Sequence, residues 1–191
     1  GDDLSNLTFF IRDSCSTNAA AERHMQQRLG ISVGAIGCGA HGAANAGECC
    51  HKAKGAAALS KAVNGILTSS HTAANEWLQF VAEPLPTCST IKWWSVHDYK
   101  KVLSKHFEFI RPWAEKLKDT GICPRVIVPL LALLRDPMTI SKLRVELAGI
   151  VAAGEPLRIL THQLQADDAD LPFRASSYIE DALEKAIKSS N

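Results

Sequence analysis

The chain has almost no surplus of charge and no long apolar run. Its 191 residues include 21 Lys and Arg against 20 Asp and Glu, which gives a net charge of +1. Because non-specific binding to nucleic acid depends on a strong basic field, any DNA contact must be local or lie outside this chain. A membrane-spanning helix needs about 20 consecutive apolar residues, and the sequence has neither such a run nor a basic-then-apolar leader. We therefore expect a soluble intracellular protein with no membrane partner.

Cysteine is present but does not indicate a disulfide framework. A chain with 46% hydrophobic residues can bury a core without the disulfides on which small secreted domains depend. We therefore favour free thiols over three disulfides. The chain begins with Gly rather than Met, and the first predicted strand follows closely, so we interpret it as a fragment. The cysteines are Cys15, Cys38, Cys49, Cys50, Cys88 and Cys123.

The first part of the chain has the pattern of an α/β unit. Residues 7–12 mix Leu, Thr, Phe and Ile, which predicts a buried strand that ends before Asp13. Residues 19–28 are rich in helix formers, and alternating apolar residues over 31–36 predict a second strand. The helix between them has a length that suits a parallel crossover. A longer helical run is expected over residues 56–80.

The second part of the chain is helical in period throughout. One continuous apolar stripe predicts a helix over 99–117. Two further helices are expected over 124–134 and 140–157, and Pro156 is expected to kink or divide the latter. A last amphipathic helix is predicted over 176–188.

Three short motifs follow one another in an informative order. They are Asp13 at a strand end, then Cys38-Gly-Ala-His41, then Lys92-Trp93-Trp94-Ser95. This order resembles the core of hAT-family transposases and their domesticated relatives. The resemblance implies an α/β fold, with a partial RNase H-like sheet over residues 1–92 and an all-helical insertion domain over 93–191. The chain is then mostly helical overall.

The resemblance assigns a catalytic and metal-binding role to Asp13. It matches the second of three acidic residues that hold two Mg or Mn ions for DNA cleavage and joining in this family. Such ions prefer hard oxygen ligands, and one carboxylate cannot hold a pair of them. The matching first aspartate and the glutamate have no counterpart in this chain, so we expect no transposase activity from it alone. The alternative is that Asp13 caps the helix that follows its strand.

The pair Cys38 and His41 has two interpretations. The favoured one is architectural, with a thiol and an imidazole packed where the sheet meets the next helix. The other is zinc, because soft ligands that suit a four-coordinate site follow closely. The additional ligands would be Cys49, Cys50 and His51.

The motif at Lys92 and Trp93 matches the Arg-Trp motif of the family with Lys in place of Arg. We expect Trp93, with Trp94 beside it, to be a buried anchor that joins the two parts of the chain. Stacking on a DNA base is the alternative. The basic residues that follow are expected to form a solvated helix face. These are Lys100, Lys101, Lys105, Arg111, Lys116 and Lys118.

Two functions remain open from the sequence. The first is a catalytically incomplete fragment of a hAT-like transposase, with DNA as partner and a nuclear location. The second is a domesticated, non-catalytic helical scaffold that binds protein partners and is stabilised by zinc.

Overall fold

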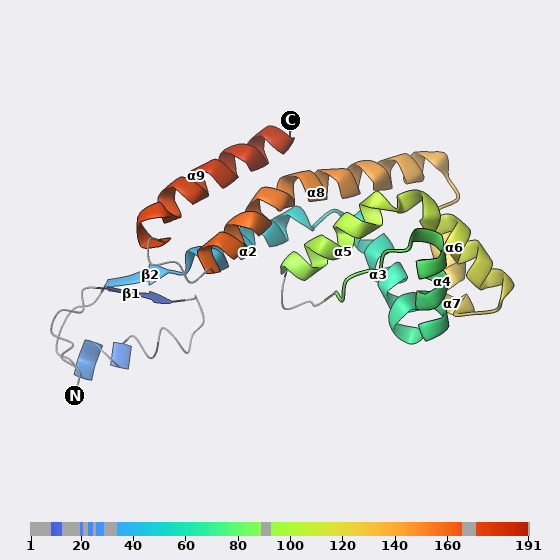
Figure 1. Ribbon diagram of the computed structural model, residues 1–191, viewed down its shortest axis with the longest axis horizontal. Coiled ribbons are helices and arrows are strands. Elements are labelled where there is room, and N and C mark those ends of the chain that lie inside the picture. Colours follow the sequence, from blue (N-terminus) through green and yellow to red (C-terminus); the bar gives the residue numbers. More distant parts are fainter. Residues whose placement is uncertain are drawn as a thin grey trace.

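The computed structural model describes residues 9–12, 20, 23–24, 26–28, 34–88, 93–165 and 171–190. Residues 20, 23–24 and 26–28 are helical. The named elements, labelled in Figure 1, are β1 (Phe9–Arg12), β2 (Gly34–Gly37), α2 (Gly39–Cys50), α3 (Lys54–Ser69), α4 (His71–Val81), α5 (Trp93–Lys105), α6 (Phe107–Asp119), α7 (Pro124–Leu133), α8 (Pro137–Gln165) and α9 (Leu171–Ser190).

The predicted RNase H-like sheet is wrong. Strands β1 and β2 pair in parallel, with Phe9 opposite Gly34 and Arg12 opposite Gly37, but they form a sheet of two strands only within the described residues. After Gly37 the chain enters α2, because alanines favour a helix over a third strand. An RNase H-like fold needs a broader sheet, and the described part of the chain is instead mostly helical.

Two of the predicted helices are each divided in two. The run expected over 56–80 breaks at Ser70, which has extended backbone angles and whose hydroxyl accepts a hydrogen bond from the Ala73 N–H at 3.2 Å. Ser70 thereby caps α4, as serine commonly does at a helix N-terminus. The stripe expected over 99–117 breaks at His106, between α5 and α6. The imidazole of His106 contacts Glu83 at 2.6 Å, a tertiary contact that periodicity cannot predict.

The other helix predictions hold with changed boundaries. Helices α7 and α9 confirm those predicted over 124–134 and 176–188, and α9 is longer at both ends. Pro156 does not divide its helix, since α8 runs unbroken through it from Pro137 to Gln165. Helix α2 was not predicted, because its glycines weaken the helical pattern.

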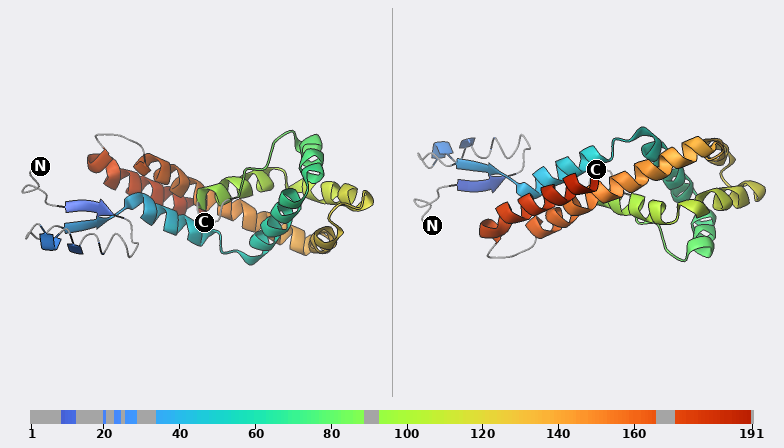
Figure 2. Two further views of the ribbon diagram at one scale, coloured as in Figure 1. Left: turned by 90° about the horizontal axis from the view of Figure 1, so that it is seen from below. Right: turned by 90° about the horizontal axis from the view of Figure 1, so that it is seen from above.

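Helix α8 is the central helix of the described structure. It contacts α2, α3, α5 and α9, so helices that are distant in sequence meet along it. Figure 1 shows α9 and α2 beside its second half, and α4, α6 and α7 gathered at the opposite end. The views from below and above in Figure 2 show the same elongated arrangement, with the strand pair at the end near α2.

The main hydrophobic core lies among α3, α4, α5, α6, α7 and the first half of α8. Trp77 and Trp113 meet there edge to face, with ring centroids 5.5 Å apart. Each indole N–H donates to a backbone carbonyl, Trp77 to Glu83 at 2.9 Å and Trp113 to Ala73 at 3.1 Å. The core joins residues on both sides of the domain boundary expected at residue 92, and that boundary stays a prediction. Among the described residues, no helix has the length and apolar character that crossing a bilayer demands.

Candidate functional site

A large cleft lies between α2, α3, α5 and the end of α8. We call it the α2–α5 cleft, and its volume is about 990 Å³. Its lining combines apolar side chains with polar ones. The apolar lining includes Ala40, Ala44, Ala57, Trp94, Val96 and Leu164. The polar lining includes Asn45, Glu48, His51, Ser60, Lys61 and Lys100.

Lys100 is the unusual member of this lining. Only 2% of its surface is exposed, and its Nζ donates to the backbone carbonyl of His51 at 3.3 Å. Burial lowers the pKa of Lys100, because the ammonium loses hydration, although the negative charge of Cys88, when that thiol is ionised, acts in the opposite direction. A lysine so completely buried is rare in proteins unless it is paired.

His51 lines the cleft and packs against the buried His97. Their rings meet edge to face with centroids 5.8 Å apart. Burial lowers the pKa of His51 to about 3, and the positive charges of Lys100 and of a protonated His97 add to the effect. His51 is therefore neutral at pH 7 and adds no charge to the cleft.

A network of charged side chains next to the cleft links α5 to α8. His97 is fully buried, and its Nε2 lies 2.9 Å from Glu155, which also accepts from Lys101 at 2.9 Å. Arg158 contacts Asp98 at 2.7 Å. Burial lowers the pKa of His97 despite the opposing effect of Glu155, so the neutral ring donates its N–H to that carboxylate. The network fixes the helix that presents Lys100.

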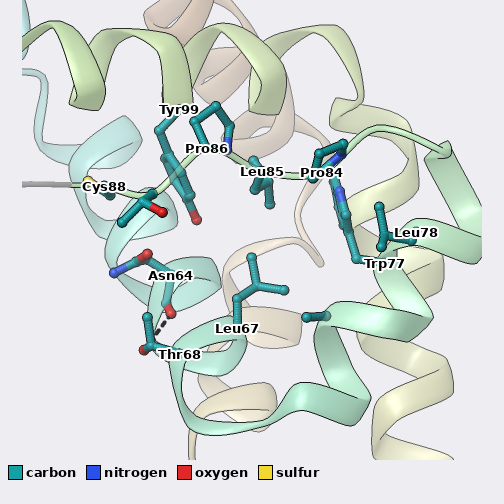
Figure 3. Close-up of a pocket in the computed structure, with 12 residues that line it drawn as sticks. Asn64, Leu67, Thr68, Trp77, Leu78, Pro84, Leu85, Pro86, Cys88 and Tyr99 are labelled. Carbon is teal, nitrogen blue, oxygen red and sulfur yellow. Dashed lines mark hydrogen bonds between the residues drawn. The ribbon is translucent and has the colours of Figure 1, made fainter.

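A smaller pocket lies beside the cleft. Its volume is about 250 Å³, and Figure 3 shows Leu67 pointing into it between Trp77, Leu85 and Tyr99. Two of its lining residues, Asn64 and Cys88, also line the α2–α5 cleft. Its lining is mainly apolar, and the Tyr99 hydroxyl is held by the carbonyl of Ser60 at 3.5 Å. We regard it as an extension of the cleft.

The structure brings some of the predicted site residues to the cleft. Cys38 is half-buried just before α2, His41 is exposed in the first turn, and both line the cleft. Trp94 also lines it and contacts the His162 ring, with centroids 5.9 Å apart. Trp93 begins α5. Asp13 and Lys92 lie outside the described residues.

The metal predictions gain no support from this geometry. In the part of the chain that the structure describes, no three His, Cys, Asp or Glu side chains gather closely enough to hold a metal ion. Cys49 is exposed on α2, and the side chain of Cys50 is not among those described. Zinc at Cys38 and His41 stays a prediction, as does Mg or Mn at Asp13.

Sequence reasoning missed the buried centre of the site. The basic residues from 101 to 118 are exposed as predicted, but the prediction of a solvated Lys100 is wrong. Its spacing could have indicated burial, because Lys100 follows Val96 by four residues and precedes the buried Leu103 by three, which places all three on one helix face. The pairing of His97 with Glu155 joins distant helices and leaves no local signal.

Comparison with known proteins adds no relative. No protein-family model, no curated protein and no solved structure matches this chain. The resemblance to hAT transposases therefore depends on its sequence motifs alone, and so do the predicted DNA partner and nuclear location.

Proposed function

We propose that this chain is a non-catalytic helical binding module that holds a peptide segment of a protein partner in the α2–α5 cleft. The observation that carries the proposal is the cleft itself. Its volume of about 990 Å³ lies at the upper end of the range for ligand sites, roughly 300–1,000 Å³. Its mixture of small apolar side chains and a few polar groups suits a peptide.

The fold supports a binding role over the transposase hypothesis. A metal-dependent transposase needs its acidic residues on one RNase H-like sheet, and the described residues contain only a pair of strands. The cleft instead is built on helices, and two of them, α3 and α5, belong to the large core. Sites on such rigid elements keep their shape for a partner. A transposon-derived origin is compatible with this role and is supported by the order of the motifs.

The test is selection from a display library of random 12-residue peptides, followed by calorimetry of the selected sequences. We expect micromolar binding that is lost in Ala57→Trp, which fills the cleft from α3. The matched control is Ala148→Trp, at an exposed position of α8 that does not line the cleft. Circular dichroism checks that both variants are folded.

Three results would contradict the proposal. The first is that no selected peptide binds more tightly than its scrambled version. The second is equal binding by wild type and Ala57→Trp. The third is cleavage of supercoiled plasmid by the purified chain with Mg²⁺ or Mn²⁺, which would indicate an enzyme.

A further inference from the structure

Lys100 carries a buried charge with no acidic partner among the described residues. Lys101 and Lys105, on the same helix, each contact a carboxylate, at 2.9 Å from Glu155 and 2.6 Å from Glu83. Both are largely exposed, with 49% and 64% of their side-chain surface accessible. Lys100 is 2% exposed, and its hydrogen bond in the described structure goes to a neutral carbonyl. The lysine that most needs a counter-charge is therefore the one that lacks it.

The ammonium of Lys100 can donate further hydrogen bonds to a ligand. An ammonium has three N–H donors, and the carbonyl of His51 takes one of them. Burying an ammonium costs several kcal/mol unless it is paired and hydrogen-bonded. Because Lys100 lines the cleft, an anionic group of a ligand can reach the remaining donors.

The surroundings favour a carboxylate next to an apolar side chain. Val96, one turn before Lys100 on α5, lines the same cleft, as do Trp94 and Leu164. The other charged groups of the lining are Lys61 and Glu48, which are both exposed, and neutral His51 adds no charge. The buried end of the cleft is therefore positive and bordered by apolar surface.

A nucleic acid fits these features less well than a peptide. Affinity for a phosphate backbone comes from several lysines or arginines that each neutralise a phosphate. Two lysines line this cleft, and the whole chain has a net charge of only +1. One buried ammonium instead suits a single carboxylate, which makes a strong charge-assisted hydrogen bond.

We propose that the α2–α5 cleft recognises an acidic peptide segment, in which an Asp or Glu carboxylate pairs with Lys100 and a neighbouring apolar side chain packs against Val96, Trp94 and Leu164. This inference rests on the proposed function and specifies its ligand. It makes Lys100 the residue that determines specificity.

The test is a double-mutant cycle on the peptides selected from the random library. In each peptide, Asp or Glu is replaced by Asn or Gln, which removes the charge and keeps the shape. Binding is measured to wild type, to Lys100→Met and to Lys118→Met. The last is the matched control, because it removes the same charge from an exposed position on α6.

We expect one acid-to-amide change to weaken binding to wild type and to Lys118→Met at least about tenfold. The same change should leave binding to Lys100→Met almost unaltered. A different result is that peptides bind to wild type and not to Ala57→Trp, while the acid-to-amide change has no effect, or the same effect in all three proteins. That result would overturn this inference and leave the proposed function standing. If no peptide binds in the cleft, the proposed function and this inference are both wrong.

A second measurement needs no variant. Wild-type protein labelled with ¹⁵N is titrated with 4-methylpentanoate and, separately, with 4-methylpentanamide. We expect the acid to shift the backbone amide signals of Ala57, Val96 and Lys100 at concentrations where the amide does not. Equal shifts with both probes would contradict recognition of a carboxylate. In a separate competition experiment, a duplex oligonucleotide is added to the complex with a selected peptide at equal concentration. Displacement of the peptide would contradict this inference and indicate that the ligand is a nucleic acid.

Discussion

At the scale of single residues, burial decides the charge of the two histidines that meet behind the cleft. His97 is fully buried, and its link to Glu155 does not outweigh the cost of removing an imidazolium from water. The pKa of His51 is lowered to about 3, first by burial and then by the positive charges of Lys100 and of His97 when it is protonated. Both rings are neutral at pH 7, so protonating them in acid should destabilise the fold around them.

The pH dependence of stability follows from these lowered pKa values. Between pH 6.5 and about 3 the unfolded chain binds a proton at residue 51 that the folded chain does not. The free energy of unfolding should therefore fall as the pH drops through this window, by up to about 1.4 kcal/mol per pH unit for one histidine. Urea unfolding at pH 7.5, 6 and 5 measures the effect. His51→Gln should lose less stability between pH 7.5 and 5 than wild type, and identical profiles would contradict this explanation.

Gly154 makes room for His97. A Cβ at Gly154 would lie 2.6 Å from Nδ1 and 2.8 Å from Cε1 of His97, whereas at Gly149, on the same helix, it would meet nothing within 4 Å. Gly154→Ala should lower the free energy of unfolding by about 1–3 kcal/mol through overpacking. Gly149→Ala should raise it by up to about 1 kcal/mol through helix propensity. Denaturant midpoints of the two variants should move in opposite directions, and a stabilised Gly154→Ala would show that the ring can shift freely.

At the scale of elements, one helix supplies the missing cap of another. The residue before α3, Ala53, has no side chain to bond the free N–H groups of the first turn. Glu146 of α8 does this instead, since its Oε2 accepts from the Ala56 N–H at 2.7 Å. Gly55 leaves the space for it, because a Cβ there would lie 2.6 Å from the same oxygen. A carboxylate at this place also interacts favourably with the helix dipole.

Removing this contact should therefore cost as much as losing a local cap. Glu146→Ala is expected to lower the free energy of unfolding by about 1–2 kcal/mol. Glu115→Ala is the control, because it removes an exposed glutamate whose partner in the described structure is Arg111, one turn away, and it should cost at most about 0.5 kcal/mol. Thermal and urea unfolding measure both variants. Equal losses would show that the α8-to-α3 contact adds nothing beyond an ordinary surface pair.

At the scale of the whole molecule, the described residues form a larger and a smaller hydrophobic cluster, and both pack against α8. The larger cluster packs α3 to α7 against the first half of α8. The smaller one, around Ala43, Leu160 and Ala182, packs α2 and α9 against its second half. Leu183 and Ile187 of α9 remain 47% and 62% exposed. The end that carries α9 should open more easily than the larger cluster.

Hydrogen exchange read by mass spectrometry should show this difference. Amides of α9 are expected to exchange by local opening, well before those of α3 and α6. Ala182→Gly should speed exchange in α9 alone, whereas Ala114→Gly, at a fully buried position of the larger cluster, should speed it in the slowest helices. Equal protection in α6 and α9 would indicate one cooperative unit.

The sequence by itself determined where most helices lie and which of their faces are buried. The apolar spacing over residues 99–117 predicted one buried stripe. Five of its positions, Tyr99, Leu103, Ile110, Trp113 and Leu117, are buried, whereas Val102 and His106 are half-buried. This works because helical period and apolar burial are local properties of the chain. The motif-based expectation of an RNase H-like sheet failed, since a sheet depends on strands that no local pattern near residues 9–37 can supply.

Only the tertiary structure decided which of these faces meet and what the site is. The break at His106, the cap from Glu146 and the partner of His97 each join residues that are far apart in sequence. Lysine is typical of a surface position, but Lys100 is buried where α5 packs against α2 and its Nζ meets the carbonyl of His51. Helix propensity and apolar periodicity are properties of the local sequence. The cost of burying a charge depends instead on every element that surrounds it.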